Sequence, residues 1–332
     1  MRDHMKAAVH YKYGPPSVLL IEERDVPSPE EDEVQIQIHY CTVNRTDSAA
    51  IQAIPFLGRM ITGLFKPKFA IPGGEFSGVI SAVGENVRGY QVGQRVFGFK
   101  DIGGATQAEY TCIHPRFLTS IPEGINCRQA VACSEGAHYA YSGIKKIRLR
   151  AGQNALVYGA SGAIGSAAVQ LLKAMDLHVT AVVSTRHVDL MRQLGADKVV
   201  DYTKEDFTQD EIQYDFVFDA VGRTSFFKCF RLIKRGGKFI ASDLGDHREN
   251  IWLPAVTSII KPFIGFRETL FPFPSDVADT LKVIVDLMIQ GKFSALIDRE
   301  YALDDIVAAY EYVGSHRKTG NVIVRTSYAD NS

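Results

Sequence analysis

The chain has 332 residues, of which 46% are hydrophobic and 23% are charged, and its 37 Lys and Arg against 38 Asp and Glu give a formal net charge of −1. This length allows one to three domains with a sizeable core, and the balanced charge argues against nucleic acid or an anionic membrane as a partner. Five scattered cysteines without a Cys-x-x-Cys pair favour a reducing, cytoplasmic environment.

The first third of the chain is predicted to be rich in β-structure. From Lys6 to about Ile121, short Val and Ile runs such as EVQIQIHY alternate with Gly and Pro turns. Alternation of apolar and polar residues between turn residues is typical of strands, and GVISAVGENVRGYQVGQRVFGF has hairpin spacing. These patterns predict a β-barrel or a sandwich.

Strands and helices alternate after about Asn126. The runs ALVYGA, HVTAVVS, KVVDY, FVFDAVG and GKFIASD indicate strands, and the segments between them predict a parallel, doubly wound sheet. We expect neither a signal peptide nor a membrane span, because Pro254, Lys261 and Pro262 interrupt the apolar stretch 252–266. Two helices are predicted before the final strand NVIVR, which we expect to rejoin the first domain.

The strand ALVYGA ends in a Gly-rich turn, residues 159–165, that runs directly into an apolar helix. Gly162 would allow a pyrophosphate close to the backbone, Gly165 would allow the helix to pack on the strand, and the helix N-terminus would attract phosphates. Ala160 stands where the usual fingerprint has its first glycine. The turn predicts a dinucleotide site contacted by Ala160, Ser161, Gly162, Ala163 and Ile164.

Cofactor choice depends on the end of the next strand, which reads VVSTRH. An acidic residue there would hold the ribose of NADH. Ser184, Thr185 and Arg186 instead offer hydroxyl groups and a bidentate cation, with no carboxylate at that position, so we predict NADPH. The alternative is that Arg186 is only a solvated loop charge.

Several motifs occur in order along the chain, including MKAAVHYKYGPPSVLLIEE, PGGEFSGVISAVGENV, VGQRVFGF, YGASGAIGSAAVQLLK and LGADKVVDY. Together they make nearly the whole chain resemble the medium-chain dehydrogenase/reductase superfamily. The resemblance is to its zinc-lacking quinone reductase and zeta-crystallin-like branch. It implies an α/β protein with a GroES-like β-barrel catalytic domain, residues 5–125 and 292–327, and a Rossmann domain with a doubly wound parallel sheet, residues 126–291. It also implies a homodimer, in which the last strand of the sheet, near residues 261–270, could pair across a two-fold axis.

The resemblance also bears on metal binding. Zinc enzymes of this superfamily use a cysteine and a histidine at positions that correspond here to Asn44 and Gly74. A carboxamide binds Zn²⁺ poorly, glycine offers no ligand, and Cys133, near the expected third position, cannot hold the ion alone. We therefore expect no metal. Without a Lewis acid, an unactivated alcohol is hard to oxidise, which favours hydride transfer from NADPH to a quinone or an α,β-unsaturated carbonyl.

Several further cofactor contacts are implied only by the resemblance. Asn44 would face the nicotinamide, and Tyr202 and Arg186 would contact the adenosine phosphate. The alternatives are a turn residue at position 44 and a plain β-turn near the C-terminus. The other implied contacts are Ala220, Val221, Gly222, Lys318, Gly320 and Asn321.

The proton donor and the substrate pocket are the least determined parts. His138 or Tyr139 could supply a proton, although aromatic residues at helical spacing usually belong to a core. The apolar excursion between Ala50 and Ala70 is either a lid over the substrate or a surface packed on the barrel. The predicted pocket residues are Phe56, Leu57, Met60, Phe65 and Phe271.

Two rival functions stay open from the sequence. One is a zinc-independent alcohol or carbonyl dehydrogenase, which product analysis would separate from a C=C or quinone reductase. The other is a non-catalytic NADPH-binding protein with a structural or sensing role, because one fold supports many functions.

Overall fold

The computed structural model describes residues 3–54, 59–243, 249–271 and 276–329, so Phe56 and Leu57 of the predicted pocket lie outside the described residues. The chain forms two compact units. The first contains residues 1–135, 277–286 and 294–332, and the second contains residues 136–276 and 287–293. The domain limits 5–125, 126–291 and 292–327 stay a prediction.

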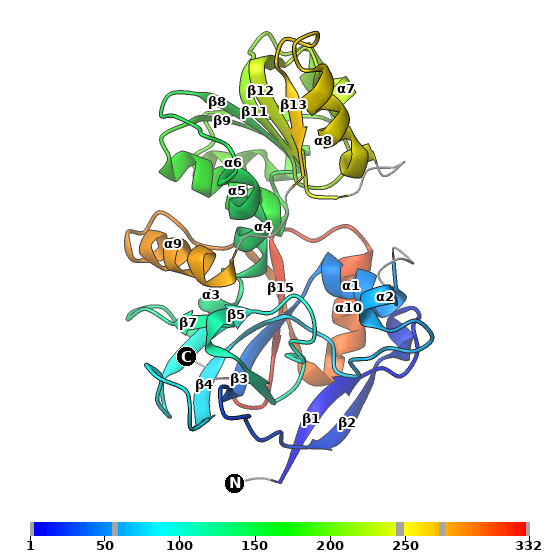
Figure 1. Ribbon diagram of the computed structural model, residues 1–332, viewed down its shortest axis with the longest axis vertical. Coiled ribbons are helices and arrows are strands. Elements are labelled where there is room, and N and C mark those ends of the chain that lie inside the picture. Colours follow the sequence, from blue (N-terminus) through cyan, green and yellow to red (C-terminus); the bar gives the residue numbers. More distant parts are fainter. Residues whose placement is uncertain (1–2, 55–58, 244–248, 272–275, 330–332) are drawn as a thin grey trace. The chain divides into compact units, whose positions relative to one another are not determined.

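The second unit is built on a parallel six-stranded sheet in the order β10-β9-β8-β11-β12-β13 (Figure 1). Its central strands are rich in Val, Leu, Phe and Ala, and these side chains are buried, as a parallel sheet covered on both faces requires. The predicted doubly wound sheet is therefore confirmed. The strands are β8 (Asn154–Tyr158), β9 (His178–Val183), β10 (Lys198–Asp201), β11 (Tyr214–Asp219), β12 (Ile233–Ala241) and β13 (Glu268–Leu270).

Five described helices accompany this sheet. The apolar helix predicted after the Gly-rich turn is α5, and eight of its residues are buried. No helix in the described ranges combines enough length and hydrophobicity to cross a lipid bilayer. The helices are α4 (Glu135–Ile144), which starts on the last residue of the first unit, α5 (Ala163–Ala174), α6 (Val188–Gln193), α7 (Phe226–Cys229) and α8 (Glu249–Ile260).

The first unit contains a seven-stranded sheet with the path β14-β15-β3-β4-β5-β7, and β6 also pairs with β3. β15, which is red in Figure 1, lies antiparallel to β3, so the last strand does return to the first sheet as expected. A separate hairpin joins β1 and β2. The strands are β1 (His4–Val9), β2 (Leu20–Asp25), β3 (Val34–Val43), β4 (Glu75–Val83), β5 (Arg95–Phe99), β6 (Tyr110–Ile113), β7 (Leu118–Ser120), β14 (Ile297–Ala302) and β15 (Asn321–Arg325).

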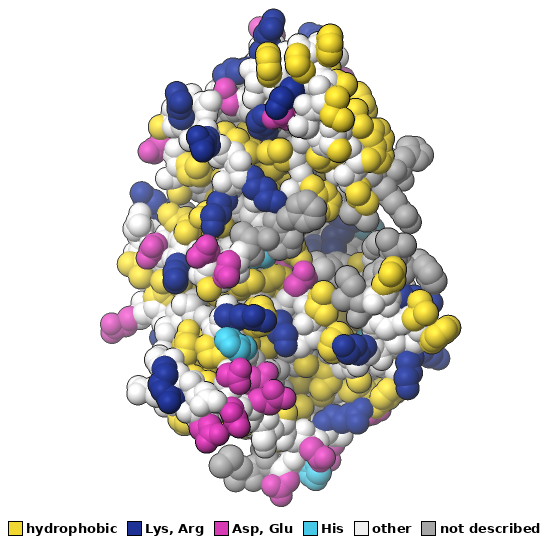
Figure 2. All heavy atoms as spheres, in the orientation of Figure 1, with side chains coloured by type: hydrophobic (Ala, Val, Ile, Leu, Met, Phe, Trp, Pro, Cys, Tyr) yellow, Lys and Arg dark blue, Asp and Glu magenta, His cyan; other side chains and the backbone are white. Residues whose placement is uncertain are grey.

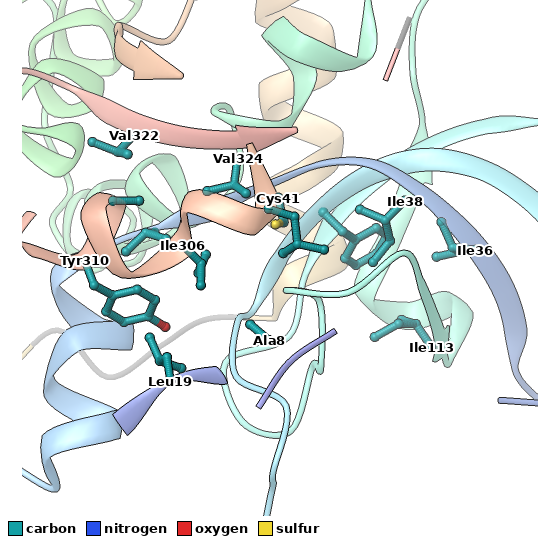
Figure 3. Packing of buried hydrophobic residues seen from close by; sticks show 14 of the residues in the cluster. Ala8, Leu19, Ile36, Ile38, Cys41, Ile113, Ile306, Tyr310, Val322 and Val324 are labelled. Carbon is teal, nitrogen blue, oxygen red and sulfur yellow. The ribbon is translucent and has the colours of Figure 1, made fainter. Parts of the chain in front are cut away.

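Helix α10 (Ile306–Gly314) packs on the first sheet and fixes the end of β3. Figure 3 shows Ile306 and Tyr310 of α10 within the same apolar cluster as Ile38 of β3. The Tyr310 hydroxyl donates to Gln107 Oε1 at 2.8 Å, and Gln107 Nε2 donates to the backbone oxygen of Thr42 at 3.0 Å. The core therefore holds the backbone that leads into the site. The remaining helices with residues in this unit are α1 (Arg45–Gln52), α2 (Arg59–Thr62), α3 (Cys127–Val131) and α9 (Val277–Ile289).

Candidate functional site

The Gly-rich turn leaves the N-terminus of α5 open to an anion. Gly162 is the residue that precedes the helix, and no side chain caps it. A Cβ at Gly162 would meet only the Gly159 carbonyl oxygen, at 3.7 Å, so protein atoms do not fill the space beside it. The first N–H groups of a helix lack intrahelical acceptors and carry partial positive charge. The turn fits a pyrophosphate, as the sequence predicts.

Gly165 has the predicted packing role. A Cβ at this position would lie 2.3 Å from the Gly159 oxygen, so only glycine lets α5 pack this closely on the turn that precedes it. This close approach fixes the direction of the helix N-terminus.

The loop after β11 is organised by Asp219, a residue that the sequence analysis did not identify. Its carboxylate is fully buried and accepts the N–H groups of Val221, Gly222 and Thr224 at 2.8–3.0 Å. Burial is the main reason that the pKa of Asp219 rises to about 6, although these hydrogen bonds oppose the rise. Gly222 has a φ of +67°, where glycine is favoured. Asp219 thus holds the predicted cofactor residues 220–222 in one conformation.

A carboxylate does lie beside Thr185, contrary to the expectation from VVSTRH. The Thr185 hydroxyl bonds Asp201 Oδ2 at 2.6 Å and contacts Thr203 Oγ1 at 2.9 Å. Burial by itself would raise the pKa of Asp201, but hydrogen bonds from Thr185 and Thr203 lower it to about 2. The oxygens of Asp201 are occupied, and the Thr185 and Thr203 hydroxyls are already hydrogen-bonded to them. Arg186, which is exposed, therefore remains the predicted phosphate ligand in this segment.

Tyr202 lines a cavity of about 400 Å³ in the second unit. Its ring stacks on Tyr158 with the centroids 6.2 Å apart, and it is half exposed. Lys204 and Lys228 also line the cavity. An aromatic wall with nearby ammonium groups suits a flat heterocycle that carries phosphate.

The first unit contains a buried polar network centred on Glu75. Glu75 Oε1 accepts from Ser134 Oγ at 2.8 Å and from the Glu135 N–H at 2.6 Å. Glu75 Oε2 accepts from Thr42 Oγ1 and Asn44 Nδ2, both at 2.6 Å. Four donors around two oxygens leave this carboxylate fully hydrogen-bonded, as a buried charge requires.

Asn44 connects this carboxylate to a second carboxyl group. Asn44 Nδ2 also donates to Glu135 Oε2 at 2.6 Å, and Asn44 Oδ1 accepts from Lys318 Nζ at 3.1 Å. The amide orientation is fixed, because the reverse would turn its oxygen toward two carboxyl groups and its NH₂ toward an ammonium. Lys318 Nζ donates a second bond to the Gly320 oxygen at 2.8 Å. The structure therefore brings together Asn44, Lys318 and Gly320, three of the predicted residues.

The network holds more acidic than basic groups. Burial, followed by the charges of Glu75 and Asp47, raises the pKa of Glu135 well above its ordinary value. Burial also raises the pKa of Asp47 to about 7, and it lowers the pKa of Lys318 against the pull of Glu135 and Glu75. Because crowded buried carboxyl groups cannot all ionise, the network retains a proton near neutral pH.

This network does not fit a zinc ion. Both N–H bonds of the Asn44 amide point at carboxyl groups, and a Cβ at Gly74 would lie 2.8 Å from the Lys100 oxygen and 3.2 Å from the Phe99 ring. The described ranges contain no group of three or more His, Cys, Asp or Glu residues arranged to hold a metal ion. Glu135, rather than Cys133, is the side chain that meets Asn44.

Other predicted residues lie apart from these contacts. Asn321 is buried and donates to the Ala132 and Leu296 oxygens, which gives it a structural role in the first unit. His138 is also buried, and burial lowers its pKa to about 4, so its ring carries no readily lost proton at pH 7. Tyr139 is half-buried, with its ring 5.7 Å from that of His138.

The predicted substrate pocket is only partly described. Met60 and Phe65 are 78% and 91% exposed. Neither side chain is therefore packed on the barrel, which was the alternative to a lid over the substrate. Phe271 is half-buried, and its backbone oxygen accepts from Lys146 Nζ at 2.9 Å. A lid over the substrate stays a prediction.

Comparisons with known proteins agree with this architecture. Residues 30–123 match the alcohol dehydrogenase GroES-like domain, and residues 194–324 match a zinc-binding dehydrogenase domain. A 2-methylene-furan-3-one reductase from Solanum lycopersicum is 31% identical over 336 residues, covering 96% of this chain and 79% of that protein. An NADPH-dependent alkenal/one oxidoreductase from Arabidopsis thaliana, described as chloroplastic, has the same identity and coverage.

The quinone oxidoreductase of Homo sapiens is 29% identical, covering 93% of this chain and 94% of that protein. The solved quinone oxidoreductase of Coxiella burnetii shares the fold, with a TM-score of 0.82, 21% identity and coverage of 97% of this chain and 99% of that one. Fold and site together define a two-unit oxidoreductase with a nicotinamide cofactor. The chain belongs to the medium-chain dehydrogenase/reductase superfamily, in the branch of quinone and alkenal/one oxidoreductases, and the predicted family is confirmed.

Proposed function

We propose that the protein uses NADPH to reduce quinones or α,β-unsaturated carbonyl compounds without a catalytic metal. The observation that carries this proposal is the network of the buried Asn44, Glu75 and Glu135 with the half-buried Lys318, which offers hydrogen-bond donors and an exchangeable proton but no metal ligand set. Reduction of a conjugated acceptor needs a hydride and a proton, whereas oxidation of a plain alcohol needs its hydroxyl activated. The names of the tomato, Arabidopsis and human relatives support the same substrate class.

The cofactor would be held by the second unit. The N–H groups at the start of α5 would bind the pyrophosphate, and the loop fixed by Asp219 would lie beside it. Arg186 would bind the 2′-phosphate, and Tyr202 would line the adenosine side. When bound, NADPH supplies the hydride. The remaining residues considered for contact, Ser161, Ser184, Ala220 and Asn321, stay predictions.

The first test is consumption of NADPH with 1,4-benzoquinone, 9,10-phenanthrenequinone and a medium-chain 2-alkenal, with NADH in parallel. We expect turnover that prefers NADPH and survives treatment with a chelator. Product analysis of the alkenal should show a reduced C=C bond and an intact carbonyl group. Reduction of the carbonyl instead would support the dehydrogenase alternative, and cofactor binding without any turnover would support a sensing or structural role.

We also propose that the protein is a cytoplasmic homodimer that pairs through the second unit. Figure 2 shows hydrophobic side chains gathered on the face that carries α8. Trp252 and Ile259 of α8 are 49% and 78% exposed, and Phe263 in the turn that follows is 91% exposed. A contiguous exposed apolar surface is typical of a protein interface. β13 pairs only with β12 among the described strands, so its other edge is available to a second copy. Location in the cytoplasm rests on the five free cysteines.

A further inference from the structure

We propose that residues 59–68 of the first unit bind the surface of an anionic phospholipid bilayer. We call this segment the docking loop. The inference goes beyond the proposed function and does not depend on it, because it concerns the surface on which the protein works and not the compound that it reduces. It rests on three features of the loop, which are its exposed apolar side chains, its hydrogen-bonded turn and its charges of one sign.

The docking loop presents apolar side chains to solvent. Met60 is 78% exposed, Leu64 is 51% exposed and Phe65 is 91% exposed. Single exposed apolar residues are ordinary on protein surfaces, but several in one short segment are typical of a surface that binds a partner. Because these side chains already lie outside the core, they can enter an apolar phase without any rearrangement of the first unit.

Hydrogen bonds hold the loop in this conformation. The Tyr13 hydroxyl donates to the Gly63 oxygen at 2.7 Å, and the Lys68 N–H donates to the Thr62 oxygen at 2.7 Å. Gly63 has a φ of +117°, in the region where glycine is favoured. Phe65 lies inside the turn that these bonds close, so its exposure is a property of the folded chain.

Every charged residue in the docking loop is a cation. The loop contains Arg59, Lys66 and Lys68, and no acidic residue occurs between Asp47 and Glu75. Lys66 and Lys68 are exposed, and among the residues that the structure describes neither has an acidic partner at salt-bridge distance. Figure 2 shows yellow and dark blue side chains together at the edge of the first unit that carries α2 in Figure 1. Both ammonium groups can therefore bind phosphate groups.

This combination favours a bilayer over a second protein. On an anionic membrane, lysines are attracted to the headgroups while neighbouring apolar side chains enter the boundary of the acyl chains. A second copy of the loop would bring cations against cations, since a two-fold contact pairs each surface with itself. The whole chain has a net charge of −1, which argues against a membrane partner. The surface potential of a bilayer, however, falls off within about 10 Å and acts on the nearest charges.

Binding to vesicles tests the proposal with the full chain. Vesicles of phosphatidylcholine and phosphatidylglycerol in equal parts should carry the protein down in sedimentation at low salt, and vesicles of phosphatidylcholine alone should not. Lys66→Glu combined with Lys68→Glu should weaken binding by about 30-fold or more, and Phe65→Ser should weaken it by about 10-fold or more. High salt should reduce the binding of the wild type.

Two controls match these variants within the same unit. Arg88→Glu combined with Arg116→Glu makes the same change in net charge at exposed positions outside the loop, and Val92→Ser removes an apolar side chain that is 63% exposed. Both controls should bind vesicles like the wild type. Because all of these variants alter exposed side chains, their midpoints of urea unfolding should stay close to that of the wild type.

A fluorescence readout reports contact with the acyl chains. The chain contains one tryptophan, Trp252, so Phe65→Trp in a Trp252→Phe background places the only indole in the docking loop. Its emission should move to shorter wavelength with the anionic vesicles, and lipids with brominated acyl chains should quench it. Val92→Trp in the same background should show neither change.

Three results would overturn the proposal. These are no binding of the wild type to anionic vesicles, equal losses in the loop variants and their controls, or an indole at position 65 that brominated lipids do not quench. A wild-type dimer that Phe65→Ser converts to monomers would assign the loop to a second copy instead. Vesicle binding is measured without cofactor or acceptor, so turnover without vesicle binding would remove the docking surface and leave the proposed function standing.

Discussion

Arg186 should decide the preference for NADPH over NADH. The Thr185 hydroxyl already bonds Asp201 at 2.6 Å, so it cannot also donate that proton to a 2′-phosphate. An exposed guanidinium at Arg186 would then provide the main charge-assisted hydrogen bonds in this segment. Such bonds contribute about 1.5–3 kcal/mol, which corresponds to a change in Kd of roughly 10- to 150-fold.

The test is the Kd of each nucleotide for wild type and Arg186→Ala, measured by quenching of protein fluorescence or by calorimetry. We expect the Kd of NADPH to rise by this factor and the Kd of NADH to stay nearly constant. Arg186→Lys should be intermediate, because it keeps the charge but loses the planar fork. Arg192→Ala, which removes an exposed arginine paired with Asp189 at 2.9 Å on α6, is the control.

Two results would refute this reasoning. Equal losses of NADPH and NADH affinity would mean that Arg186 supports the loop rather than the phosphate. An unchanged preference for NADPH would assign the phosphate to other groups, of which Lys204, beside the Tyr202 cavity, is the first to examine.

Three further predictions concern the stability of the fold and the assembly of the proposed dimer. Tyr310→Phe removes the buried donor to Gln107 Oε1 and should lower the free energy of unfolding by about 1–3 kcal/mol in a urea titration. Asp219 has an ordinary pKa of 3.8 and a folded pKa of about 6, so the folded state binds more protons between these values. Its contribution makes stability fall by about 3 kcal/mol as the pH rises through that window, and Asp219→Asn should lose this dependence. Phe263→Glu, in the turn after α8, should convert the proposed dimer to monomers in sedimentation, whereas Phe65→Glu, which is equally exposed in the first unit, should not.

Each of these predictions has a clear contrary result. Wild-type stability in Tyr310→Phe would show that solvent satisfies Gln107. A pH dependence retained by Asp219→Asn would assign it to other buried carboxyl groups, such as Asp47 and Glu135. A dimer that survives Phe263→Glu would move the interface away from α8.

The sequence predicts those features that depend on residues close to one another along the chain. The Gly-rich turn is recognised because its glycines are contiguous with a strand and a helix, and the structure shows the close contact at Gly165 that this spacing requires. The return of β15 to β3 follows from a last strand that lacks a parallel partner downstream. These arguments need only the neighbours of each residue in the chain.

Asp201 was missed although a signal existed. The end of β9 itself carries no acidic residue, since Ser184, Thr185 and Arg186 follow it. β10 lies parallel to β9, with Asp201 paired to Val183, so its carboxylate lies at the same edge as Thr185. The carboxyl ends of neighbouring parallel strands must be considered together.

Glu135 had no comparable signal. It lies 91 residues from Asn44, and Lys318 lies 274 residues from Asn44. No periodicity joins positions so far apart, and Glu135 stands beside His138 and Tyr139, whose ring chemistry favoured them as acids. Only the packing of β3, β4, the start of α4 and the C-terminal turn brings these groups to one place.

Asn44 is part of this polar network and Gly74 is closely packed on its neighbours, so neither is merely the site of a missing metal ligand. A histidine at position 74 would place its Cβ 2.8 Å from the Lys100 oxygen and against the Phe99 ring. A cysteine at position 44 would remove the amide that donates to both Glu75 and Glu135, leaving two buried carboxyl groups without their shared donor. Breaking a buried charged network in this way costs several kcal/mol, typically about 3–5. Restoring both ligands would therefore destabilise the first unit before a metal could bind, and the surroundings of these two residues favour a site that holds a proton.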